Sequence, residues 1–255
     1  MKIIRLLWGD FDRYYSQIVK AKKYDFNEEV FVWGKENLNK LTSLGYNCHL
    51  IDDEPYDYNI ANNHTFISYS SLTHKIVGIK IALSIHKEIL FLDWDCVPTK
   101  PIDDNFYNEI KRKESSLQVP LYCYPMTAFD VMKSQTDDEV MNKFFDVLSE
   151  NISKHSHVMG DSYILPNTGF FYCNDIEIVD DLLDIIRYNN LQGIPDELSV
   201  LLYTKPFGLD WYINNVEPTV ISGKKHGLDF WNEAEEKLSN FIKTKITKDN
   251  YFEHL

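Results

Sequence analysis

The sequence predicts an α/β fold in which a mostly parallel central sheet is flanked by helices. Short apolar runs alternate with helix-like segments through the first hundred of its 255 residues, and this alternation is typical of a parallel sheet covered on both faces. The chain is 44% hydrophobic and 14% aromatic, which is enough apolar material for one large core or two unequal lobes. Because we find no internal repeat and no linker rich in proline, glycine or serine, we expect one continuous domain over residues 1–255.

Each element of the first half is predicted by an apolar run and the turn residues beside it. Residues 3–8 form a short apolar strand that ends before Asp10, and a helix-like stretch follows. Further strands are expected at residues 30–33, 48–51 and 88–92, and helices at residues 36–43 and 73–85. In the last of these helices apolar side chains recur at Ile76, Ile79 and Leu83, the spacing of a helix that is buried against a core.

The second half is less regular, although its longer helices have clear apolar stripes. Strands are expected at residues 119–124, 170–173 and 218–222, and helices at residues 138–152, 176–188, 196–203 and 232–245. The final helix begins with acidic residues and ends with lysines, and this polarity complements the helix dipole.

The overall charge and the length of the apolar runs limit the classes of function. A net charge of −13 does not favour a broad basic face for nucleic acid, although it is compatible with a local basic groove. No apolar run approaches the roughly 18 residues of a transmembrane helix, and the start of the chain lacks the features of a signal peptide. The four scattered cysteines are expected to be reduced thiols. We therefore expect a cytoplasmic protein with no stable membrane insertion.

Two acidic residues, Asp93 and Asp95, directly follow the apolar run at 88–92. In open α/β sheets ligands bind beyond the carboxyl ends of the strands. Two carboxylates there can hold Mg²⁺ or Mn²⁺ together with the phosphates of a substrate. Strand alternation would direct both acids to the same side and Trp94 elsewhere. The alternative is that the acids only end a strand at the surface, since D-x-D also arises by chance.

The segment HKEILFLDWDCVPTKPI around these acids resembles the metal-binding D-x-D region of GT-A (Rossmann-like) glycosyltransferases. It is similar to the glycogenin-like and lipopolysaccharide galactosyltransferase group. The resemblance implies that Asp93 contacts the ribose and the metal of a nucleotide sugar, that Asp95 binds the metal, and that the cofactor is Mn²⁺ or Mg²⁺. It also implies a nucleotide-sugar-binding half, residues 1–100, and an acceptor-binding half, residues 101–255.

Two further segments resemble site motifs of the same family. NTGFFYCN, which begins at Asn167, is similar to the motif that lines the sugar and acceptor pocket, where Gly169 would permit close approach of the backbone. IPDELS resembles the acidic pair that begins a helix beside the transferred sugar. The resemblance thus implies roles in catalysis for Asn167, Asp196 and Glu197. Without the family, the two segments are equally an ordinary turn and an ordinary helix start.

A fourth segment, SGKKHG, resembles the family's C-terminal His-Gly-Lys-Trp region. This resemblance implies that His226 completes the metal shell and that Lys224 or Lys225 contacts the diphosphate. Both lysines precede the histidine here, whereas the family's lysine follows it, so the lysine assignment departs from the family pattern.

Three other residues are candidates for donor contacts. Lys75 precedes Asp93 by 18 residues, near where the family carries a basic residue that contacts the donor, and His74 and Lys80 compete with it for this role. Trp8 and Gly9 end the first strand, where GT-A proteins bind the nucleotide base. The alternatives are the solvated edge of a helix for Lys75 and a core position for Trp8.

The resemblance implies an enzyme, a hexosyl- or pentosyltransferase that moves a sugar from a nucleotide sugar, expected to be UDP-linked, to an acceptor hydroxyl. The glycogenin-like likeness implies retention of configuration; if the enzyme inverts, Asp196 or Glu197 is the leading candidate base. A surface glycan is the first expected acceptor and a hydroxymethylated base of phage DNA the second, in which case the compartment is the host cytoplasm. The alternatives are a metal-dependent phosphoryl or nucleotidyl transferase and a non-catalytic binding domain with a transferase fold.

Overall fold

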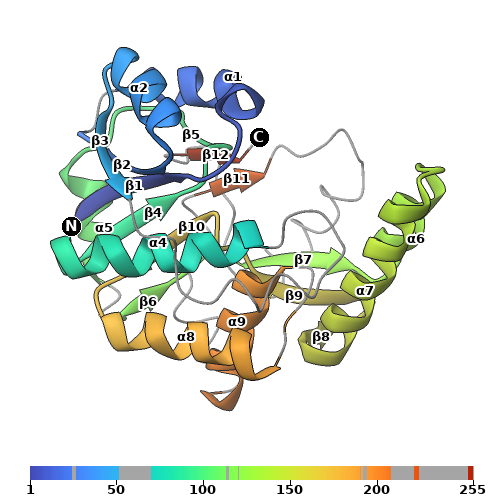
Figure 1. Cartoon of the computed structure of the whole chain (residues 1–255). Helices are drawn as coiled ribbons and strands as arrows, with labels where there is room; N and C mark the ends of the chain where they lie inside the picture. Colours follow the sequence, from blue (N-terminus) through green and yellow to red (C-terminus); the bar gives the residue numbers. More distant parts are fainter. Residues whose placement is uncertain are drawn as a thin grey trace.

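A six-stranded sheet forms the centre of the computed structural model, with the strand order β3-β2-β1-β4-β10-β6 (Figure 1). The structure describes residues 1–24, 27–51, 70–112, 115–119, 121–189, 191, 194–207, 221–223 and 252–254. The parallel strands are β1 (Lys2–Leu7), β2 (Glu29–Trp33), β3 (Asn47–Ile51) and β4 (Ile89–Leu92). Strand β10 (Phe170–Cys173) is antiparallel to both of its neighbours, β4 and β6 (Leu117–Gln118). The predicted mostly parallel central sheet is therefore confirmed.

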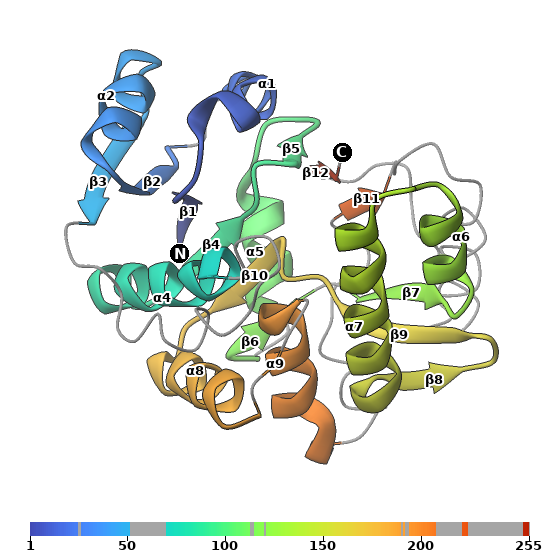
Figure 2. The ribbon, with the colours of Figure 1, turned by 45° about the vertical axis from the view of Figure 1, so that its right-hand side comes forward.

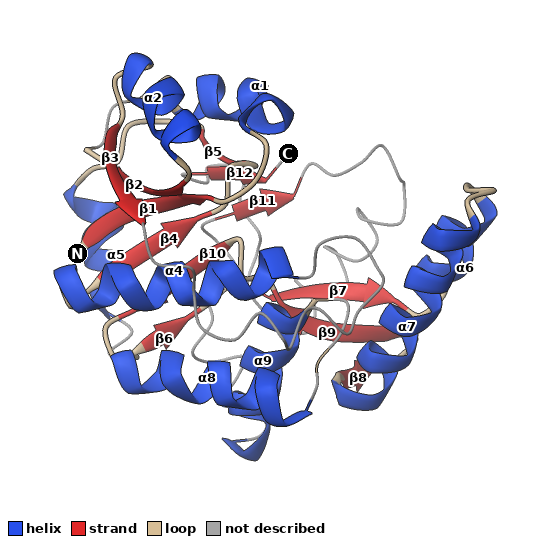
Figure 3. Cartoon of the chain, in the orientation of Figure 1, coloured by secondary structure: helices blue, strands red, loops and turns tan. Residues whose placement is uncertain are grey.

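Helices cover both faces of this sheet (Figure 3). Alternate strand residues such as Ile4 and Phe91 share one buried cluster with α4 (Ser70–His86), α8 (Ile176–Asn189) and α9 (Pro195–Thr204). The intervening residues, such as Ile3 and Leu7, point to the other face. The helices on that face are α1 (Phe11–Ala21), α2 (Lys35–Ser43) and α5 (Asp104–Arg112). Burial on both faces explains why the central strands are apolar runs without alternation.

Two three-stranded sheets extend the structure beyond the central one (Figure 2). One is antiparallel and consists of β7 (Leu121–Pro125), β9 (Ser162–Pro166) and β8 (His157–Met159). Beside it lie α6 (Ala128–Ser134) and α7 (Glu139–His155). The other joins β5 (Cys96–Pro98), β12 (Phe252–His254) and β11 (Ile221–Gly223). A short 3-10 helix, η1 (Lys205–Phe207), follows α9.

Two of the predicted elements need correction. The strand expected at residues 119–124 is found as β7 (Leu121–Pro125), which starts two residues later than predicted, whereas the short strand β6 (Leu117–Gln118) of the central sheet was not predicted. The strand expected at 218–222 overlaps β11 only in part, and the helix expected at 232–245 lies outside the described residues. Within the described part of the chain, no helix is both long and apolar enough to cross a bilayer.

Candidate functional site

A cleft of about 190 Å³ opens at the carboxyl ends of β1 and β4. Its walls come from the end of β1, from α1, from α4 and from the turn after β4. The lining residues are Leu6, Leu7, Trp8, Gly9, Tyr14, Gln17, Lys75, Asp93, Trp94 and Asp95. The strand order reverses between β1 and β4, and this is the position at which open α/β sheets bind their ligands. The cleft brings together five residues that the sequence singles out, namely Trp8, Gly9, Lys75, Asp93 and Asp95.

The D-x-D segment forms a tight turn after β4. Cys96 N donates to Asp93 O at 3.0 Å, which closes the turn, and Asp93 N donates to Gly169 O at 2.8 Å. Trp94 turns into the core, where its indole Nε1 donates to Leu6 O at 2.8 Å. Both acidic residues line the cleft, as strand alternation predicts, but the cause is this turn and not a continuing strand.

A buried arginine from β1 holds the turn in place. Arg5 is fully buried, and its guanidinium donates to Asp93 O at 2.5 Å and to Cys96 O at 3.0 Å. The guanidinium lies 5.1 Å from the centre of the Trp94 ring, and Nε is paired with Glu28 Oε2 at 2.7 Å. These interactions with one planar group fix the position of the D-x-D turn relative to β1. Arg5 was not predicted as a site residue, although a lone basic residue inside an apolar strand is a signal that could have identified it.

Lys75 links the D-x-D turn to the start of α9. Its Nζ lies 2.8 Å from Asp93 Oδ2 and 2.9 Å from Asp196 Oδ2, and it also donates to Thr168 Oγ1 at 3.3 Å. Thr168 Oγ1 in turn donates to Asp196 Oδ2 at 2.6 Å. Lys75 is only 4% exposed, so the alternative of a solvated helix edge is wrong for this residue. That alternative fits Lys80, which is half-exposed and paired with Asp180 at the surface.

The electrostatics of this group are dominated by carboxylates. Burial raises the pKa of Asp93 and the neighbouring Asp95 and Asp196 carboxylates raise it further, whereas Lys75 acts in the opposite direction. Burial alone would lower the pKa of Lys75, but the Asp196 and Asp93 carboxylates raise it above its ordinary value. When all four groups are ionised, three negative charges face one positive charge. The excess negative charge suits a bound cation.

Asn167 and Gly169 bring β10 close to the D-x-D turn. The side chain of Asn167 is largely buried, and its Oδ1 accepts from Gly169 N at 2.9 Å. A Cβ added to Gly169 would lie 2.9 Å from Asn167 Oδ1 and 3.2 Å from Asp93 Oδ2. Gly169 is thus required for close contact with Asp93. The role of Asn167 that the structure displays is to hold this turn.

The acidic pair at the start of α9 divides into a buried and a partly exposed residue. Asp196 is 2% exposed, and within the described residues its Oδ1 has no hydrogen-bond partner. Glu197 is only partly buried. Of the two acids, Asp196 is therefore the one that joins the Lys75 group. Thr168, which completes the link to Asp196, was not predicted as a site residue, although it lies inside the NTG motif.

An aromatic group borders the other end of the cleft. Trp8 is partly exposed, and its ring stacks with His74 at a centroid distance of 6.4 Å and meets Trp33 edge-on at 6.4 Å. Gly9 is exposed beside it. Trp8 therefore both packs against the core and lines the cleft, and its contact with a nucleotide base stays a prediction. The predicted residues Lys224, Lys225 and His226 lie outside the described residues.

Comparisons with known proteins show a likeness in fold without a likeness in sequence. No family model and no curated protein matches the chain. Mouse xyloside xylosyltransferase 1, in its apo form, superposes with a TM-score of 0.50 at 11% identity, over 100% of this chain and 97% of that one. Two of the other matching structures superpose with lower TM-scores. They are the Mn/GDP form of core-mannan synthase A from Aspergillus fumigatus (TM-score 0.44, 10% identity, 85% and 72% covered) and a glycosyltransferase involved in glycosylation of the major capsid of PBCV-1 (0.41, 13%, 100% and 93%). The xylosyltransferase match confirms the predicted fold class: this chain has the α/β fold of GT-A-type glycosyltransferases.

Proposed function

We propose that the chain is a glycosyltransferase that binds a divalent cation and a nucleotide-sugar donor in the cleft between the ends of β1 and β4. The observation that carries the proposal is the convergence of Asp93, Asp95 and the buried Lys75 on this cleft. The cleft lies at the point where the strand order reverses, in a fold shared with a xylosyltransferase.

The donor set at the cleft fits Mn²⁺ or Mg²⁺. Asp93 and Asp95 offer carboxylate oxygens, which hard cations prefer, and phosphate oxygens of the donor would complete the shell. The three carboxylates of the group exceed its one lysine by two charges, and a divalent cation would balance this excess. Bound there, the metal would supply Lewis-acid stabilisation of the departing nucleoside diphosphate.

The protein's own residues then take complementary roles. Arg5 and Gly169 hold the D-x-D turn rigid, so the two carboxylates need not reorganise when the donor binds. The partly exposed ring of Trp8, next to Gly9, offers an apolar surface to the nucleotide base. Asp196 Oδ1 is a buried oxygen beside the Lys75 ion pair, with no hydrogen-bond partner among the described residues. We assign Asp196, Glu197 and Asn167 to the sugar side of the site on the basis of the family resemblance.

The position of β11 supports a contribution from the residues that follow it. Gly223 and Cys96 both pair with His254, from opposite sides, so Gly223 lies two strand spacings, about 10 Å, from the residue after Asp95. Lys224, Lys225 and His226 directly follow Gly223 in the sequence. We propose that His226 joins the metal shell and that one of the two lysines contacts the diphosphate.

The donor is proposed to be a UDP-sugar, and the acceptor a hydroxyl of a glycan. Whether the sugar is a hexose or a pentose follows from the donor that binds. The net charge of −13 favours a glycan over the second candidate, a hydroxymethylated base in phage DNA, because DNA binding depends on basic residues that neutralise phosphates. A cytoplasmic location is proposed with both acceptors.

A thermal-shift screen of UDP- and GDP-sugars, each with and without Mn²⁺, tests the proposal. A ligand that binds only the folded chain raises the melting temperature. We expect stabilisation by a UDP-sugar only when Mn²⁺ is present, and loss of this stabilisation in Asp95→Ala. Stabilisation by nucleoside triphosphates alone would favour the phosphoryl- or nucleotidyl-transferase alternative. Equal shifts in wild type and Asp95→Ala would contradict the proposed site, and donor binding without transfer to any acceptor would favour a non-catalytic binding domain.

A further inference from the structure

A second group of metal-ligating side chains lies near the amino-terminal ends of the parallel strands, opposite the ends that carry the proposed donor site. Glu29 is the first residue of β2, His49 lies in β3, and His86 is the last residue of α4. These residues lie near the amino-terminal ends of the parallel strands, whereas Asp93 follows the carboxyl end of β4. The group of Glu29, His49 and His86, termed here the Glu-His-His cluster, is therefore separate from the proposed donor site.

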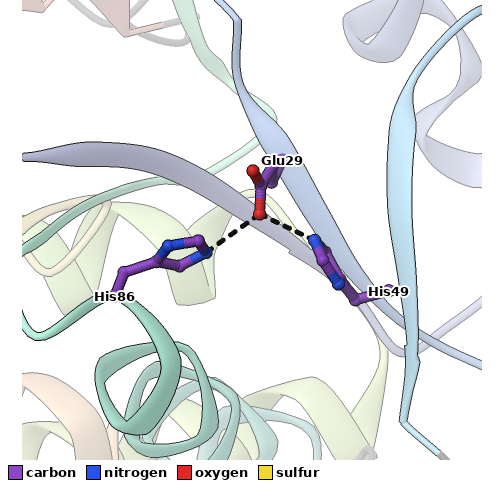
Figure 4. Close-up of side chains that lie close together, drawn as sticks. All are labelled: Glu29, His49 and His86. Carbon is purple, nitrogen blue, oxygen red and sulfur yellow. Dashed lines mark hydrogen bonds and ion pairs between the residues drawn. The ribbon is translucent and has the colours of Figure 1, made fainter.

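The rings of His49 and His86 both point at one carboxylate oxygen of Glu29 (Figure 4). Glu29 Oε2 lies 2.7 Å from His49 Nε2 and 2.9 Å from His86 Nε2. One ligand atom from each residue lies within 4.8 Å of the others. Two imidazole nitrogens and one carboxylate oxygen held this close together are the ligand set of many three-residue zinc sites.

Neighbouring residues hold the cluster in this arrangement. Phe31 pairs with His49 across β2 and β3, so the two side chains lie on the same face of the sheet, as does Glu29 two residues before Phe31. The Phe31 ring stacks on the His49 ring at 4.7 Å and meets the His86 ring edge-on at 6.2 Å. Lys2 Nζ binds the other oxygen of Glu29, Oε1, at 2.7 Å. These contacts orient all three side chains, as supporting residues around metal sites do.

We propose that Glu29, His49 and His86 bind a zinc ion, with water completing the coordination shell. Imidazole nitrogens suit Zn²⁺ and related transition metals, whereas Mg²⁺ and Ca²⁺ prefer oxygen ligands throughout. The ion can reach the cluster from solvent, because the side chains of His49 and His86 are 37% and 21% exposed. Zinc binding at this cluster is independent of the proposed transferase function.

Zinc binding requires a small change in the cluster. Zn–N and Zn–O distances of about 2.0–2.2 Å in a tetrahedral site place neighbouring ligand atoms about 3.3 Å apart. The nitrogen–oxygen distances of 2.7 and 2.9 Å must therefore widen by about half an ångström. Each imidazole must also present Nε2 without its hydrogen, so zinc affinity should fall in acid. The bound ion would join the end of α4 to β2 and β3.

Zinc titration of the chelator-treated chain tests this inference, with a chromophoric zinc chelator as competitor. The Asp95→Asn variant is used as the background so that the D-x-D site does not contribute. We expect one equivalent of zinc to bind, and the affinity to fall at least about tenfold in His49→Gln and in His86→Gln, made in that background. His155→Gln, which changes a histidine of α7 on the far side of the molecule, is the matched control and should bind zinc as its parent does (Figure 2).

Two outcomes of the titration would overturn the inference. If the Asp95→Asn variant binds no zinc, this result alone overturns the inference, whatever the histidine variants do. Unchanged affinity in both His49→Gln and His86→Gln would overturn it as well. Circular dichroism without zinc shows whether each variant is folded, and if His86→Gln is not, the affinity of the more exposed His49→Gln decides. Substitution by Co²⁺ provides a second readout, since its visible absorption should report nitrogen ligands in the parent and change in the histidine variants.

Discussion

The buried Lys75 pairs with Asp93, whose Oδ2 lies 2.8 Å from Nζ, although one residue belongs to a helix and the other to a turn after a strand. The pair fastens α4 to the D-x-D turn, and through Asp196 it reaches the start of α9. Segments separated widely in the sequence are thereby joined at the floor of one cleft. The same carboxylates that would bind a cation therefore also contribute to the stability of the fold.

Replacement of Lys75 should destabilise the fold strongly. Lys75→Met leaves the buried Asp196 carboxylate and the partly exposed Asp93 carboxylate without a cation, and breaking a buried pair such as Lys75–Asp196 costs about 3–5 kcal/mol. Lys80→Met, on the same helix, removes a half-exposed pair with Asp180 and should cost at most about 1 kcal/mol. Urea denaturation near neutral pH measures both values. Equal losses of unfolding free energy in the two variants would show that Lys75 does not neutralise the Asp93 and Asp196 carboxylates.

Gly169→Ala should weaken metal and donor binding more than it weakens the fold. The new methyl group would lie 3.2 Å from Asp93 Oδ2 and would displace that carboxylate or Asn167. Gly160→Ala is the control, because its backbone has a positive φ of 60° but no atom lies near the added carbon. It should cost stability through strain alone. Isothermal titration with UDP and Mn²⁺ is expected to show a loss only for Gly169→Ala, and unchanged affinity there would contradict a close role for the NTG turn.

Arg5 and Glu28 should show strong energetic coupling. Each is buried, and removal of one breaks the buried ion pair of the other, so Arg5→Met and Glu28→Gln should each cost about 3–5 kcal/mol. The double variant should cost clearly less than the sum of the two single variants. Denaturant melts of the four proteins in the cycle measure the coupling. Simple additivity would mean that the 2.7 Å contact contributes no pairing energy.

Tyr172 should make stability fall in alkali. Burial and the adjacent Glu88 carboxylate raise the pKa of Tyr172 to about 12, and its hydroxyl donates to Glu88 Oε1 at 3.1 Å. Because the folded pKa is above the unfolded value of 10.0, the folded chain holds the proton more tightly. This contribution is intact below about pH 10 and is lost between about pH 10 and pH 12.

Tyr172→Phe removes the group and should flatten the decline over that interval. Tyr188→Phe is the control, since Tyr188 is 80% exposed, and its decline should match that of the wild type. Denaturant melts at several alkaline pH values compare the three proteins. An unchanged slope in Tyr172→Phe would contradict the assignment.

The sequence predicted the four parallel strands of the central sheet and five of the residues that line the cleft. The reason is physical: strands buried on both faces must be apolar, and their ends must carry the polar residues that a ligand needs. Asp93 and Asp95 are therefore visible as the first acidic residues after the run that became β4. The same reasoning located helix α4, whose apolar side chains pack on the sheet.

Other features depend on contacts that a local pattern does not record. Strands such as β5 and β8 have three residues each, too few for any periodicity, and they exist because they pair with distant segments. The burial of Lys75 depends on Asp196, 121 positions away in the chain (196 − 75), and a lysine on a helix otherwise indicates a solvated face. Arg5 was missed for the same reason, because its partners lie on other elements.

Binding of Mn²⁺ in the presence of UDP tests the central claim most directly, since the claim is that Asp93 and Asp95 hold a cation against a diphosphate. The electron paramagnetic resonance signal of unbound Mn²⁺ measures the metal that remains in solution. We expect tight binding of one Mn²⁺ by the wild type with UDP, and loss of this binding in Asp95→Asn. Asp146→Asn, which changes an exposed acid paired with Lys133, should bind as the wild type does. Equal binding by wild type and Asp95→Asn would contradict the account.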